Sequence, residues 1–79
     1  MVINLVSGSR TFAAMYILRG STGPVLRVEY AGCRVVDVPL FRGLQGVYVG
    51  TTLFDVRVSA DGRSVRITRV SGNVKLSAA

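Results

Sequence analysis

The chain has 79 residues, of which 49% are hydrophobic, and a formal net charge of +6. This length predicts one small domain, residues 1–79, with a thin margin of stability. Cys33 is the only cysteine and histidine is absent, which excludes an intrachain disulfide and the usual zinc-binding spacings. We therefore expect no cofactor and no metal, and a partner subunit is the remaining source of stability.

The longest apolar run, residues 12–18, is closed by Arg10 and Arg19 and is too short for a membrane span. The first residues also lack the basic start of a signal peptide. We expect a protein without a membrane span, located in the cytoplasm or in a virus particle assembled there.

Short stretches of β-branched and alternating residues recur along the chain, separated by Gly, Ser, Pro and Asp. This pattern predicts an all-β fold, a small antiparallel barrel or sandwich of about six to eight short strands. In size alone the chain resembles the SH3-like and OB-like barrels. The expected strands are Val2–Val6, Thr11–Arg19, Val25–Tyr30, Arg34–Val38, Gly46–Val49, Leu53–Ser59, Ser64–Val70 and Val74–Ser77.

The segment Ser9–Arg19 has a helical alternative, because Ser9 could cap a helix and residues 13–15 are good helix formers. Tyr16 and the Gly-rich stretch Gly20–Pro24 favour a strand that enters a hairpin, and we prefer that interpretation.

The segment Pro39–Gly50 contains one proline and several glycines, which predict an irregular connection. It also concentrates large apolar side chains around one charge. Such a segment must pack either on its own domain or on a partner. The residues predicted to contact a protein partner are Phe41, Arg42, Leu44 and Tyr48.

The strongest local signal is a hairpin over Phe54–Val70 that turns at Asp61-Gly62. A two-residue turn and the four-residue loop Ala60–Arg63 give the same register. That register places Val58 opposite Val65, Val56 opposite Ile67, and Arg57 opposite Arg66 on the other face. Two opposed arginines repel each other, so either Asp55 or an anionic partner should offset the pair.

A weak internal repeat relates Gly23–Val28 to Gly62–Ile67, since both segments place an arginine between branched aliphatic residues after a glycine. Two such halves would close into a barrel of about six or seven strands.

Catalytic chemistry has few candidate groups in this sequence. Its acids are Glu29, Asp37, Asp55 and Asp61, and no histidine is present to act as a general base. Cys33 lacks a group that would activate it and is interpreted as a small apolar filler. We expect a non-enzymatic protein without catalytic residues.

Two functional hypotheses follow. The first is a structural or interaction module that self-associates or docks on a larger protein assembly, for example as a viral or phage accessory component. The alternative is a nucleic-acid-binding barrel, supported by the net charge of +6. Its phosphate contacts would be Arg27, Arg57, Arg63, Arg66 and Arg69.

Overall fold

The computed structural model describes residues 2–78, and these residues form strands joined by turns and short connections. The prediction of an all-β chain is confirmed, and the segment with a helical alternative is a strand. The strands are β1 (Val2–Ser7), β2 (Arg10–Gly20), β3 (Gly23–Tyr30), β4 (Val35–Pro39), β5 (Gly43–Val49), β6 (Thr52–Val58), β7 (Val65–Ser71) and β8 (Lys75–Ala78).

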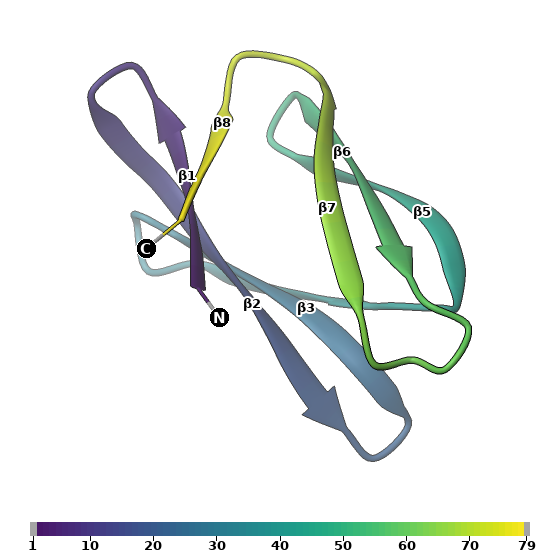
Figure 1. The fold of residues 1–79 in the computed structure, drawn as a ribbon. Helices are drawn as coiled ribbons and strands as arrows, with labels where there is room; N and C mark the ends of the chain where they lie inside the picture. The colour runs from purple at the N-terminus through teal and green to yellow at the C-terminus, as the bar shows by residue number, and fades with distance from the viewer. Residues whose placement is uncertain (1, 79) are drawn as a thin grey trace.

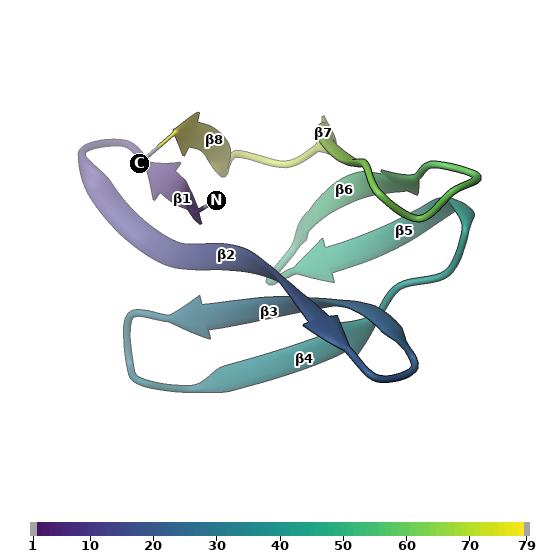
Figure 2. The same cartoon turned by 60° about the horizontal axis from the view of Figure 1, so that its bottom comes forward.

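The strands form two antiparallel sheets that face each other (Figures 1 and 2). Sheet A has five strands in the order β4-β3-β2-β1-β8, and sheet B has three in the order β5-β6-β7. The chain crosses between the sheets after β4 and again after β7, and β8 then pairs with β1. Because the strands form two separate sheets, the prediction of a closed barrel is wrong. This includes the barrel built from two repeated halves.

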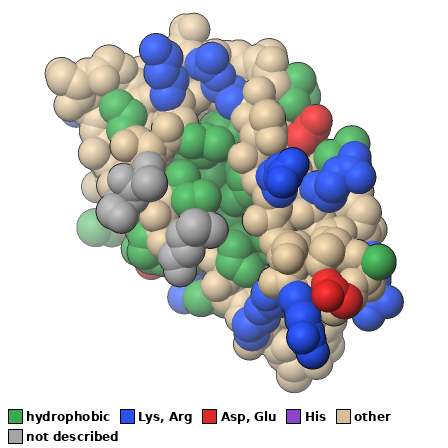
Figure 3. Space-filling model, in the orientation of Figure 1, with side chains coloured by type: hydrophobic (Ala, Val, Ile, Leu, Met, Phe, Trp, Pro, Cys, Tyr) green, Lys and Arg blue, Asp and Glu red, His purple; other side chains and the backbone are tan. Residues whose placement is uncertain are grey.

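The inner faces of the two sheets share one hydrophobic core. Alternation along β2, β3 and β6 places every second side chain in this core, as expected for strands with one buried face. Figure 3 shows hydrophobic side chains in the gap between β8 and β7. The buried hydrophobic residues are Leu5, Ala13, Met15, Leu26, Val28, Leu40, Val47, Val49, Phe54, Val56, Val58 and Val74.

The register of the β6–β7 hairpin agrees with the sequence prediction. Val58 pairs with Val65, Val56 with Ile67, and Arg57 with Arg66. The connection is the four-residue loop, closed by a hydrogen bond of 2.9 Å from the Ser59 N–H to the Ser64 carbonyl. Within it Gly62 has a φ of +74°, a conformation that glycine adopts without strain.

The segment Pro39–Gly50 is more regular than its glycines predict. Residues 43–49 form β5, and only residues 40–42 connect it to β4. Leu40 enters the core with 6% of its surface exposed. The Gln45 side chain holds the connection in place, because it donates to the Pro39 carbonyl at 3.0 Å and accepts from the Phe41 N–H at 3.2 Å.

The prediction that Cys33 is a small apolar filler is wrong, because its side chain is exposed. Cys33 lies in the β3–β4 turn, where it has a φ of +67°. Its N–H donates to the Tyr30 carbonyl at 2.9 Å, so this residue closes a tight turn.

Residues 2–78 contain no helix with the length and hydrophobicity of a membrane span.

Candidate functional site

The outer face of sheet B carries large apolar side chains on its edge strand. Val47 and Val49 of β5 are buried, so alternation directs Leu44 and Tyr48 to the opposite side. Leu44 is 58% exposed and Tyr48 is 68% exposed. Gly46 lies between them and is also exposed, which leaves the backbone at the centre of the strand open to solvent.

The same face carries the opposed arginines. A two-residue turn at Gly50-Thr51 joins β5 to β6, and the resulting register places Leu44 opposite Arg57. Arg57 is in turn opposite Arg66. One predicted protein-contact residue, Leu44, therefore shares a row of sheet B with two predicted anion-binding residues, Arg57 and Arg66.

The positive charge of Arg57 and Arg66 has no acidic partner in the part of the chain described. Among residues 2–78 the one ion pair within 4.0 Å joins Arg27 to Asp37. Asp55 therefore does not form the ion pair that would offset the repulsion. A shallow hollow of about 320 Å³ lies beside the two arginines, lined by Arg57, Ser59, Ser64, Val65 and Arg66.

Phe41 and Arg42 lie in the connection that precedes β5. Phe41 is 70% exposed, and both residues line a hollow of about 400 Å³ that also includes Asp61. Asp61 accepts hydrogen bonds from the Ser59 hydroxyl and from the Arg63 N–H. These two bonds, with a smaller contribution from the charge of Arg42, hold the pKa of the Asp61 carboxyl below its usual range.

The other three predicted phosphate contacts lie outside the row that contains Arg57 and Arg66. They are Arg27, Arg63 and Arg69. Arg63 belongs to the β6–β7 loop, where its carbonyl accepts a hydrogen bond of 2.9 Å from Arg19. Arg69 donates to the Gly72 carbonyl at 3.2 Å. Figure 3 likewise shows the Lys and Arg side chains in separate groups on the face in view.

Arg27 is on the outer face of sheet A, paired with Asp37 through two hydrogen bonds of 2.8 and 3.0 Å. The hydrogen bond lowers the pKa of Asp37 and raises that of Arg27. Glu29 on the same face accepts a hydrogen bond of 2.9 Å from the Tyr16 hydroxyl, which raises the pKa of Tyr16. Both acids are thus engaged by neighbours on their own sheet.

Residues 2–78 contain no group of three Asp, Glu, Cys or His side chains that could hold a metal ion.

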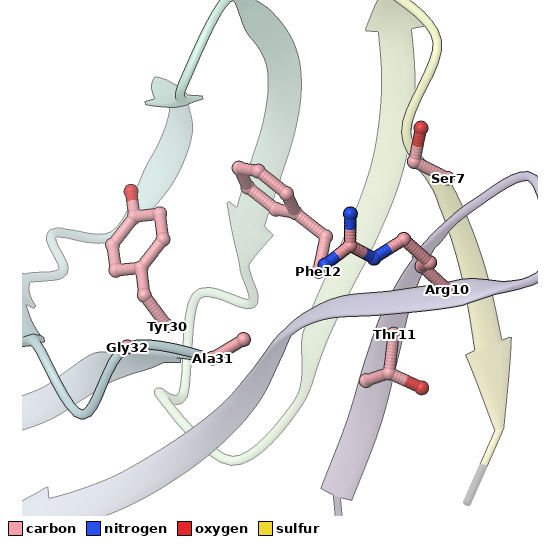
Figure 4. A pocket seen from close by; sticks show the side chains of 7 residues that line it. All are labelled: Ser7, Arg10, Thr11, Phe12, Tyr30, Ala31 and Gly32. Carbon is pink, nitrogen blue, oxygen red and sulfur yellow. The ribbon is translucent and has the colours of Figure 1, made fainter.

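A hollow of about 410 Å³ lies near the β1–β2 and β3–β4 turns (Figure 4). The rings of Phe12 and Tyr30 meet edge to face there, with centroids 5.7 Å apart. Arg34 stacks over the Tyr30 ring at 4.5 Å, and Arg10 lines the hollow. These contacts close one end of the core, and the hollow itself opens to solvent.

The free edge of β5 is a feature that sequence analysis did not identify. In a two-residue hairpin the residues that flank the turn, here Val49 and Thr52, form a hydrogen-bonded pair, and such pairs alternate along the strands. Leu44, Gly46 and Tyr48 therefore direct their N–H and C=O groups away from β6. The signal was present in the sequence, since Gly50 at the first turn position favours this hairpin.

No protein-family model, curated protein or solved structure matches this chain.

Proposed function

We propose that this protein is a non-enzymatic interaction module that docks on protein through β5 and the outer face of sheet B. A viral or phage accessory component is one setting for such a module. The observation that supports the proposal most directly is the exposure of Leu44 and Tyr48, at 58% and 68%, on an edge strand.

Two physical arguments connect this observation to docking. Large apolar side chains that share one exposed face mark interaction surfaces, and aromatic residues and arginine are enriched at such surfaces. An edge strand adds backbone donors and acceptors that another strand can pair with. The edge strand β4 of sheet A also exposes valines, but it has no aromatic side chain. On the outer face of that sheet Arg27 is paired with Asp37, and Glu29 accepts a hydrogen bond from Tyr16.

The proposal is tested by site-specific photo-crosslinking. A benzophenone amino acid replaces Tyr48 in one variant and Val35, which is 50% exposed on sheet A, in the control. The variants are irradiated in the purified state and in cells that express the protein. We expect covalent adducts with protein from position 48 and few from position 35. Equal yields at the two positions would refute the docking face.

A second candidate function is binding of single-stranded nucleic acid through Arg57 and Arg66. The specific observation in its favour is that these opposed arginines have no carboxylate within 4.0 Å among residues 2–78. A phosphate could offset their repulsion, and the exposed ring of Tyr48 on the same face could stack on a base.

Fluorescence anisotropy with a labelled mixed-sequence oligonucleotide tests this second function. Binding should weaken steeply between about 20 and 200 mM salt, because phosphate contacts release counterions. The double variant Arg57→Gln, Arg66→Gln should weaken binding further, whereas Arg27→Gln, whose charge is already paired, should change it little. Undetectable binding at low salt, or binding insensitive to salt, rules this function out.

A further inference from the structure

Each sheet has two edges, and they differ in how well they are protected against pairing with another strand. The edges are β4 and β8 in sheet A and β5 and β7 in sheet B. Proteins protect edge strands with charges, prolines and short length. β4 ends in Pro39, which lacks an N–H, β7 carries Arg66 and Arg69, and β8 has four residues and begins with Lys75.

β5 has none of these protections. Its seven residues, Gly-Leu-Gln-Gly-Val-Tyr-Val, include no charge and no proline. The N–H and C=O groups of Leu44, Gly46 and Tyr48 point to the free edge, as the hairpin register requires. An uncharged edge strand of this length with exposed apolar side chains is a template for another strand.

The arrangement of β5 about its central residue indicates which strand it would accept. Gly46 is the middle residue of Gly43–Val49, with Leu44 two positions before it and Tyr48 two positions after it. An antiparallel pair of two β5 strands, centred on Gly46, places Leu44 of each copy opposite Tyr48 of the other on the outer face. Every outward-facing N–H and C=O then meets a counterpart, and cross-strand aliphatic–aromatic pairs are favourable.

We infer that the docking partner at β5 is a second copy of this chain. A two-fold axis that passes between the two Gly46 residues relates the copies and joins the two B sheets into one sheet of six strands. The inference rests on the proposed docking function and specifies its partner. Such an interface is isologous, because the same patch contributes from both copies. Gly46 suits the axis because it adds no side chain between the two apolar pairs.

Repulsion between the two Arg57 residues does not prevent this association. In the paired sheet, Arg57 and its counterpart in the second copy are separated by three strand spacings across the sheet and by four residues along the strands. The distance between them is therefore about 20 Å. That separation exceeds the Debye length of about 8 Å at physiological ionic strength. The pairing leaves Arg57 and Arg66 on the outer face of each copy, beside the joined apolar patch.

The predicted interface is small. Pairing two strands of this length and covering Leu44 and Tyr48 of both copies buries on the order of 700 Å² in total, below the about 1,200 Å² of standard interfaces. We therefore expect a weak, reversible dimer. Light scattering after size exclusion, across a dilution series from about 1 mM, should show the conversion of dimer to monomer.

Disulfide trapping tests the position of the axis. Gly46→Cys is made in a Cys33→Ser background, because Cys33 is exposed. In a hydrogen-bonded antiparallel pair the two Cα atoms are about 5.5 Å apart, within the range that a disulfide spans. Mild oxidation should convert most of the Gly46→Cys protein to a covalent dimer. Thr68→Cys is the control, since Thr68 is exposed on the same face but opposite Asp55, two strands from the axis.

Two further variants complete the test. Leu44→Lys and Tyr48→Lys change exposed side chains and should leave the fold intact while raising the dissociation constant at least tenfold. A wild-type protein that stays monomeric at 1 mM overturns the inference, as does equal trapping at positions 46 and 68. If the protein is monomeric but position 48 photo-crosslinks to a different protein, the two-fold pairing is wrong and the docking function stands. If position 48 yields no adducts at all, both fail.

Discussion

Gly72 approaches Thr52 so closely that a Cβ atom at position 72 would lie 2.5 Å from the Thr52 hydroxyl oxygen and 2.7 Å from its Cα. Thr52 is buried, and its hydroxyl oxygen also accepts a hydrogen bond of 3.4 Å from the Val74 N–H. This contact lies where the chain leaves β7 and crosses to sheet A. The φ of Gly72, +103°, further restricts the position to glycine.

Gly72→Ala should therefore destabilise the protein by about 2–4 kcal/mol, because steric overlap adds to backbone strain. Gly8→Ala is the matched control, since Gly8 has a φ of +64° but no atom within 4 Å of the added Cβ. We expect this control to cost about 1 kcal/mol. Urea unfolding measures both variants, and equal losses would show that the Thr52 contact carries no extra cost.

The opposed pair of Arg57 and Arg66 leads to a prediction about charge reversal. Arg66→Glu replaces a repulsive cross-strand pair by an attractive one, so stability should rise by about 0.3–1 kcal/mol. The gain should shrink in about 0.5 M salt, because the pair is exposed. Arg63→Glu, in the adjacent loop, is the control for the change in net charge. A gain of the same size in both variants would assign the effect to net charge rather than to the pair.

The hairpin register was predictable because alternating valines and isoleucine fix which residues face the core on each side of one short loop. The extent of β5 was not predictable, because Gly43 and Gly46 are poor strand formers and are held in the sheet by pairing with β6. The pairing of β8 with β1 joins residues from opposite ends of the chain. No local pattern in Val74–Ser77 indicates whether that strand extends sheet B or returns to sheet A.

In the candidate site, too, local features were predictable from the sequence and the pairing between separate segments was not. Leu44, Tyr48, Arg57 and Arg66 were each identified from local features, namely exposed apolar content and strand register. Their meeting on one face depends on the register of β5 with β6, which the Gly50-Thr51 turn sets. The Gly50-Thr51 turn thus places Leu44 of the predicted protein surface directly beside Arg57 of the predicted anion surface.

The ion pair between Arg27 and Asp37 predicts how stability depends on pH. The hydrogen bond from Arg27 lowers the pKa of Asp37 in the folded state, so the pair stabilises the protein above the ordinary aspartate pKa of about 3.9. This contribution should decline as pH falls from about 4 through the lowered folded pKa. Asp37→Asn should melt at a lower temperature than the wild type at pH 7. The difference should shrink as pH falls through the lowered folded pKa of Asp37, and a difference constant with pH would contradict the assignment.

Tyr48 and Phe54 are aromatic residues on neighbouring strands that differ in burial, so they separate the proposed role in binding from a role in folding. Phe54 of β6 is fully buried, whereas Tyr48 is 68% exposed on the neighbouring strand. Phe54→Ala should cost about 3–5 kcal/mol, because it removes a large side chain from the shared core. Tyr48→Ala should cost less than about 0.5 kcal/mol, as exposed substitutions usually do.

Measuring the stability of the wild type and of Tyr48→Ala at two protein concentrations tests whether Tyr48 contributes to association. If Tyr48 contributes to association, wild-type stability should rise with concentration through mass action, and Tyr48→Ala should remove that rise without changing the value at high dilution. Urea unfolding at about 1 µM and 200 µM provides both values. A large loss for Tyr48→Ala at 1 µM would instead assign this side chain to the fold of the single chain, and the outer face of sheet B would lose its strongest apolar contact for a partner.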